Sequence, residues 1–264
     1  MQTVVLRPYP KEKIIIMNWF NVVGIISTFS LFLPVIFIIA FRLAWYKSFP
    51  ALLIYYTITF GFNFLSLDFI RSDKTFIYYY GVTNNLLDAP LMLAFLTYFS
   101  KTALFRKKMK MVIPAFLLFE VIVIILNGFS VNATIIVLGP GLLLVLCFSL
   151  LFFIHQAKIT IIHQKAAGKA LIVASILFAY GGYSFIYVVY YLLKTPYKSD
   201  TFLVYYLISL FSSVFIATGI VLERKRVREL KELQTARKEL RVIYGRAEEK
   251  EKALSKKEPR FKPL

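Results

Sequence analysis

Residues 201–230 read TFLVYYLISLFSSVFIATGIVLERKRVREL, and the stretch changes character in its middle. Residues 201–222 form an apolar run without a charged side chain, whereas the next eight residues carry four cations and two acids. A helix needs about 20 apolar residues to cross the hydrocarbon core of a bilayer, where it satisfies its own backbone hydrogen bonds. The stretch therefore predicts a transmembrane helix that continues into a charged helix beyond the membrane.

Six more apolar runs precede this one, and 59% of the 264 residues are hydrophobic, with a mean hydropathy of +0.69. We expect an all-α polytopic membrane protein, with a seven-helix transmembrane bundle over residues 1–222 and a C-terminal cytoplasmic helix. The predicted spans are approximately 17–41, 49–70, 76–99, 111–128, 132–154, 170–193 and 201–222. For the fourth and fifth runs, a re-entrant pair joined at the uncharged Asn127-Gly128 turn is the alternative.

Cations are distributed unevenly between the two predicted sides of the membrane. The connections after the first, third and fifth spans carry ten Lys or Arg residues and no acid. The N-terminal segment and the connections after the second and sixth spans carry seven cations and three acids. The positive-inside rule therefore predicts an N-terminus outside and a C-terminus in the cytoplasm, in a membrane such as the bacterial inner membrane.

The tail is predicted to be a basic cytoplasmic helix over residues 223–255 and disordered over residues 256–264, which contain two prolines. Apolar residues recur in the helix at heptad spacing, as in a short coiled coil: Leu233, Ala236, Leu240, Ile243, Ala247 and Leu254. One prediction from this seam is a homodimer through the tail. The alternative is a helix lying on anionic lipids at the cytoplasmic face.

Asp88 is the principal candidate for a functional group. It lies near the middle of the third span, where a carboxylate in hydrocarbon costs about 3 kcal/mol on insertion scales. Asn84 and Asn85 precede it by about one helical turn, so one of them is expected to share its face. No Lys or Arg lies within a predicted span to pair with Asp88. We predict a ligand or proton site here, with a structural hydrogen-bond network as the alternative.

Other polar residues are expected between the middle of the membrane and its outer surface. The sixth span carries a stripe of tyrosines at helical spacing, from Tyr180 to Tyr191, whereas Tyr190 and Tyr205 are assigned to the interfacial aromatic belt. Glu120, in the fourth span, is a candidate proton site. The predicted ligand-binding residues are Asp88, Asn84, Asn85, Asn63, Asp68, Tyr183, Tyr187 and Ser209.

Catalytic and metal chemistry find little support in the sequence. The two histidines, His155 and His163, have no third ligand nearby, and Cys147 is the single cysteine. No hydrolase elbow or phosphate-binding loop occurs. We therefore expect no catalytic residues, no metal and no cofactor. The net charge of +18 resides in the connections and the tail, so we expect the lipid bilayer as the partner rather than nucleic acid.

In helix number, orientation and helical tail, the chain resembles the seven-transmembrane-helix sensor and signalling modules of bacteria. The resemblance implies a membrane sensor that binds a small ligand in an outward-facing, tyrosine-lined polar pocket and couples it to the cytoplasmic tail. The tail would act through a cytoplasmic signalling partner or by dimerising. The alternative function is a small secondary transporter or proton-coupled carrier that uses Asp88 and Glu120.

Overall fold

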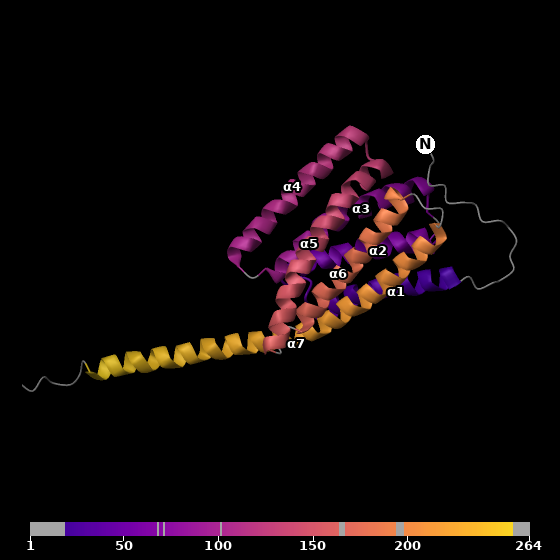
Figure 1. The fold of residues 1–264 in the computed structure, drawn as a ribbon. Coiled ribbons are helices and arrows are strands. Elements are labelled where there is room, and N and C mark those ends of the chain that lie inside the picture. Colours follow the sequence, from indigo (N-terminus) through magenta and orange to yellow (C-terminus); the bar gives the residue numbers. More distant parts are fainter. Residues whose placement is uncertain are drawn as a thin grey trace, which may run out of the picture.

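The computed structural model describes residues 19–67, 69–70, 72–100, 102–163, 167–193 and 198–255, and these form helices joined by short connections (Figure 1). The prediction of an all-α fold is confirmed. A 3-10 turn, η1, covers Thr97–Phe99, and a π-helical turn, η2, covers Val188–Leu192. The α-helices are α1 Trp19–Ala40, α2 Phe49–Ser66, α3 Lys74–Leu96, α4 Ala103–Asn127, α5 Val131–His163, α6 Ala167–Tyr187 and α7 Lys198–Ser255.

Six of the helices in the described part of the chain are long and apolar enough to cross a membrane, namely α1, α2, α4, α5, α6 and α7. This finding supports an integral membrane protein. The predicted third span, α3, does not meet the same criterion, because polar residues such as Asn84, Asn85 and Asp88 lower its hydropathy. The count of seven spans therefore stays a prediction.

Local sequence explains where α4 begins and ends. The Thr102 hydroxyl caps its first turn by accepting a hydrogen bond from the Phe105 backbone nitrogen at 3.2 Å. Gly128 follows its last residue with φ of +70°, a left-handed conformation that glycine adopts without strain. The helices on either side, α4 and α5, have 25 and 33 residues. Their lengths favour two complete helices over a re-entrant pair.

Helix α7 lies alongside both α6 and α1, and α3 lies between α2 and α5, while α4 packs at the edge against α5 and α3 (Figure 1). The backbones of α6 and α7 meet at two glycines. A Cβ on Gly168 would lie 2.6 Å from the Glu223 backbone nitrogen, and one on Gly219 would lie 2.5 Å from Cγ1 of Ile172. Small residues let helices approach this closely, so this crossing holds the two helices in register.

Large apolar side chains cover much of the outside of the bundle. Ile125 and Leu126 of α4, for example, are 76% and 77% exposed. Soluble monomers rarely expose apolar surface on this scale, whereas a lipid-facing bundle requires it.

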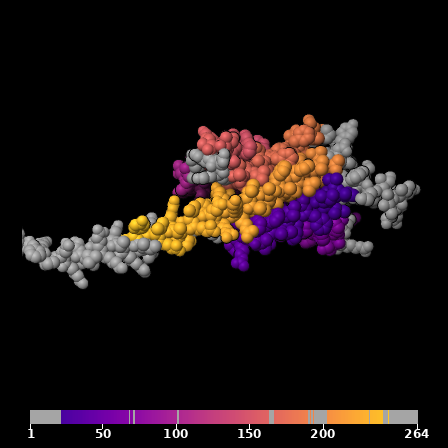
Figure 2. Space-filling view, turned by 90° about the horizontal axis from the view of Figure 1, so that it is seen from below, coloured from indigo at the N-terminus to yellow at the C-terminus, as the bar shows by residue number. Residues whose placement is uncertain are grey.

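Helix α7 continues for 58 residues, about 87 Å at 1.5 Å per residue, and its C-terminal part projects from the bundle (Figures 1 and 2). We call the end of the bundle from which it projects the tail end. Leu233 and Leu240 of the predicted seam are exposed on this single helix. The predicted disordered segment, 256–264, lies outside the described residues.

Candidate functional site

Three helices converge on the carboxyl group of Asp88. The Tyr180 hydroxyl of α6 donates a hydrogen bond to Asp88 Oδ1 at 2.9 Å. Tyr55 of α2 is a second hydrogen-bonding partner of the same carboxyl. The neighbouring Tyr56 hydrogen-bonds with Ser213 of α7. The Asp88 carboxyl is thus held by hydroxyl groups from elements that are distant in the sequence.

A second group of hydroxyls adjoins the first. The Tyr183 and Ser209 hydroxyls are 3.0 Å apart, and Tyr205 hydrogen-bonds with Ser209 and with the buried Asn63. The Tyr183 ring lies 5.9 Å from that of Tyr180 and 5.6 Å from that of Tyr205, centroid to centroid. We call the combined set the tyrosine cluster; it consists of Tyr55, Tyr56, Asn63, Asp88, Tyr180, Tyr183, Tyr205, Ser209 and Ser213.

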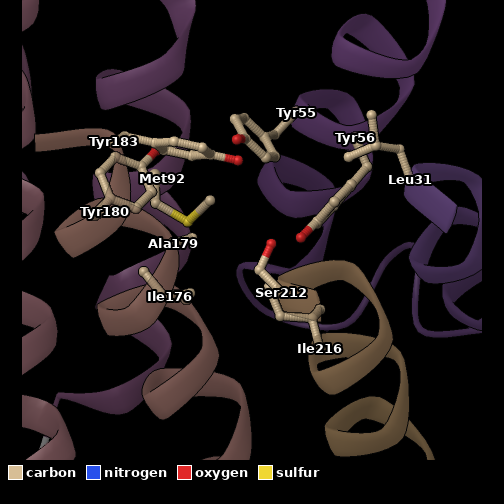
Figure 3. A pocket seen from close by; sticks show the side chains of 10 residues that line it. All are labelled: Leu31, Tyr55, Tyr56, Met92, Ile176, Ala179, Tyr180, Tyr183, Ser212 and Ile216. Atoms are coloured by element: carbon tan, nitrogen blue, oxygen red, sulfur yellow. The ribbon is translucent and has the colours of Figure 1, made fainter. Parts of the chain in front are cut away.

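A small cavity lies within the tyrosine cluster (Figure 3). Tyr55 and Tyr56 of α2 face Tyr180 and Tyr183 of α6 across it, and Ser212 lines it from α7. Its volume of about 10 Å³ is close to the minimum that one water molecule needs. A larger guest would have to move these side chains apart. The lining combines five hydroxyl groups, from four tyrosines and Ser212, with five apolar side chains, and the hydroxyls can donate to and accept from a small polar guest.

The predicted ligand-binding residues separate in the structure. Asn84 is half-buried and accepts a hydrogen bond from Thr59 at 3.2 Å, whereas Asn85 is exposed on another face of α3. Tyr187 donates to the Ile135 backbone oxygen of α5 at 3.1 Å, away from the Asp88 carboxyl. Asp68 lies outside the described residues. The structure thus brings together Asn63, Asp88, Tyr183 and Ser209 from the predicted set, with Asn84 beside them.

Glu120 of α4 is 4% exposed, and its Oε1 atom has no hydrogen-bonding partner among the described residues. It lies within electrostatic reach of Asp88. A buried carboxyl oxygen without a partner is unusual, because desolvation costs free energy that a hydrogen bond would offset.

Sequence reasoning missed Tyr55 and Tyr56, and it assigned Tyr205 to the interfacial belt. The signal for α2 was present: Tyr56, Thr59 and Asn63 follow at i, i+3 and i+7, and all three are buried. For Tyr205 no comparable signal exists, because neighbouring tyrosines do not reveal which one faces the bundle.

A second polar group occupies the tail end of the bundle. Glu223 of α7 is 0% exposed, and it accepts a hydrogen bond from the Tyr98 hydroxyl. Its Oε1 atom also forms an ion pair with Nη2 of Arg226 at 3.1 Å. The ammonium groups of Lys169 and Lys47 lie 4.3 Å and 5.4 Å from the Tyr98 ring centroid. We call Lys47, Tyr98, Lys169, Glu223 and Arg226 the tail-end cluster.

An apolar layer separates the tyrosine cluster from the tail-end cluster. Its side chains come from α3, α6 and α7, at sequence positions between the two polar groups, and each is at most 2% exposed. They are Met92, Phe95, Leu96, Ile172, Ile176, Ile216 and Ile220. The two polar clusters are therefore connected by packed side chains and by helix backbone.

Among the described residues, no group of three or more His, Cys, Asp or Glu side chains could hold a metal ion. Comparison with protein-family models, with curated proteins and with solved structures finds no match to the chain.

Proposed function

We propose that this chain is a membrane sensor in which the tyrosine cluster binds a small polar ligand and α7 transmits the change to the tail. One observation carries the proposal. Helix α7 contributes Ser209 and Ser213 to the tyrosine cluster and Glu223 to the tail-end cluster, and it continues to Ser255. No proline interrupts it, so its backbone hydrogen bonding can continue through the whole segment. A displacement at the cluster can therefore be passed to the tail along one continuous helix.

The proposal includes seven spans, an external N-terminus and a cytoplasmic tail, in a membrane such as the bacterial inner membrane. Helix α3 is the span in question. Its Asp88 carboxyl is hydrogen-bonded to neighbouring helices, and its Asn84 accepts from α2. Polar groups held inside a bundle do not face lipid, so they do not prevent α3 from crossing.

Because the cavity is small, a bound ligand would have to displace the helices around it. A ligand larger than one water must separate Tyr55 and Tyr56 of α2 from Tyr180 and Tyr183 of α6. Ser212 and Ile216 of α7 line the same cavity, so α7 must move as well. A ligand shifts the equilibrium between the closed and the opened cavity only as far as it binds the opened state more tightly. Here that difference in affinity comes from the hydroxyls to which the ligand hydrogen-bonds.

The test measures the environment of the tail in variants of the tyrosine cluster. In the full chain with Cys147→Ala and Leu240→Cys, a nitroxide at position 240 reports the tail by electron paramagnetic resonance in nanodiscs. Asp88→Asn and Tyr183→Phe each remove a proton donor or acceptor from the tyrosine cluster, so both should change the spectrum. Thr57→Val is the matched control, because Thr57 is exposed and its hydroxyl donates to the Leu53 backbone oxygen of its own helix, at 2.8 Å. Spectra that stay identical in both cluster variants would refute the relay.

A proton-coupled carrier is the second candidate. It is favoured by the carboxyl oxygen of Glu120 that has no hydrogen-bonding partner in the described part of the chain. Two carboxyl groups in one bundle could pass a proton between them through a bound water. Proteoliposomes with a trapped pH dye separate the two functions. Proton flux that both Asp88→Asn and Glu120→Gln abolish would establish transport, whereas the sensor predicts no flux that depends on Asp88.

A further inference from the structure

The tail-end cluster contains more positive charge than its own acid can neutralise. Glu223 is paired with Arg226, and its second oxygen, Oε2, is buried without a hydrogen-bonding partner among the described residues, as is Nε of Arg226. Lys47 and Lys169 form no salt bridge with a carboxylate of the described residues. Instead, both ammonium groups lie over the ring of Tyr98.

These cations repel one another. Lys169 is within electrostatic reach of Lys47, Arg106 and Arg226, with Glu223 as the one acid in that set. Four cations around one carboxylate leave a net positive charge, and cation–π contacts compensate only part of it. An anion between the cations would remove the repulsion and would accept the free donors of Lys47 and Lys169.

The position of the cluster indicates the source of the anion. Lys47 lies in the connection between α1 and α2, and Lys169 lies in the first turn of α6. Trp45, two residues before Lys47, is 94% exposed, and tryptophan favours the headgroup layer of a bilayer. Val221 and Leu222, just before Glu223 on α7, are exposed apolar residues that can contact an acyl chain. The cluster thus has a charged side at headgroup depth and an apolar side toward the acyl chains.

We propose that the tail-end cluster is a binding site for the phosphate of an anionic phospholipid, held by Lys47, Lys169 and Arg226. Basic sites between helices at the cytoplasmic face bind lipid headgroups of this kind. The site does not depend on the tyrosine cluster being a ligand site. It makes the tail-end geometry of α7 sensitive to lipid composition, because the lipid phosphate and Glu223 share Arg226.

Fluorescence of Trp45 tests the proposal. In the full chain with Trp19→Phe, Trp45 is the single tryptophan. The protein is placed in nanodiscs that contain either brominated phosphatidylglycerol or brominated phosphatidylcholine. Each brominated lipid quenches Trp45 fluorescence in proportion to its occupancy near that residue. With Lys47, Lys169 and Arg226 in place, brominated phosphatidylglycerol should quench Trp45 more strongly than brominated phosphatidylcholine does. Lys169→Gln, and separately the more exposed Lys47→Gln, should each lower that preference about fivefold.

The control is the pair Lys107→Gln and Lys110→Gln at the start of α4, which removes charge from exposed residues outside the cluster. An equal loss in this control, or no preference for phosphatidylglycerol in the wild type, would overturn the proposal. So would a Trp45 response to inorganic phosphate in phosphatidylcholine discs that Lys169→Gln abolishes, because it would assign the cluster to a soluble anion. None of these outcomes bears on the relay to the tail, so the two proposals fail independently.

Discussion

The hydroxyl of Tyr98, in the 3-10 turn after α3, donates a hydrogen bond to the carboxylate of Glu223 on α7, 125 residues later in the chain. The carboxylate is fully buried at the point where α7 leaves the bundle. This contact therefore ties the base of the tail to the turn that directly follows α3, the helix that carries Asp88.

Removing this hydrogen bond should loosen the base of the tail. Tyr98→Phe leaves a buried carboxylate with Arg226 as its remaining partner, and we expect a loss of about 1–3 kcal/mol in stability. Thermal unfolding in detergent measures the loss. Tyr244→Phe is the control, because Tyr244 is 68% exposed on the tail, and it should leave the transition unchanged. Equal stability of the two variants would mean that the contact contributes nothing.

The glycine crossing of α6 and α7 should tolerate no side chain. Gly168→Ala places a methyl 2.6 Å from the backbone nitrogen of Glu223, so the helices must separate and the unfolding temperature should fall. Gly181→Ala, on the same helix, meets its nearest atom at 4.0 Å and should be neutral or stabilising through helix propensity. A stable Gly168→Ala protein would show that this crossing is not a fixed point.

Burial of the Glu120 carboxyl should lower the stability of the bundle. Glu120→Leu removes a buried carboxyl, one oxygen of which has no partner among the residues that the structure describes, so we expect a gain of about 1–3 kcal/mol in stability. Chemical unfolding in mixed micelles measures the change. A loss of stability instead would reveal a hydrogen bond in the membrane, for example to water, that holds α4 in place.

The topology prediction depends on α3. Reporter fusions should place Lys107 and the C-terminus in the cytoplasm and Asp73 and Lys198 outside, because ten cations and no acids lie on one predicted side. If Asp73 and Lys107 report the same side, α3 does not cross, and the count of spans falls to six.

The exposed tail seam should mediate self-association. Leu240→Lys introduces a charge at a seam position and should weaken crosslinking of the detergent-solubilised protein. Gln234→Lys adds the same charge away from the seam and should have little effect. If neither change matters, the tail does not form a coiled coil, and a helix on the membrane surface is the better description.

Sequence patterns located the helices well and the site residues only in part. Apolar runs predicted α1, α2, α6 and α7 to within a few residues of their ends, because hydrophobic length is a local property. Helix α5 begins as predicted but continues to His163, nine residues past the predicted end of its span. The apolar runs did not reveal that Asn85 is exposed while Asn84 is half-buried, since the rotation of α3 about its axis depends on the helices beside it. For the same reason, the sequence did not reveal that Tyr205 hydrogen-bonds with Asn63 and Ser209.

The amino-acid sequence by itself determined that this chain is helical and built for lipid, because a bilayer accepts only long apolar segments with satisfied backbones. It also determined that Asp88 would be costly in such a helix and would need partners. Only the tertiary structure decided which partners those are. Tyr55 and Tyr180 lie 33 and 92 residues from Asp88, and they reach its carboxyl because packing brings α2, α3 and α6 together. Contacts between helices depend on how side chains interlock across three or more elements, and no pattern within one helix specifies that.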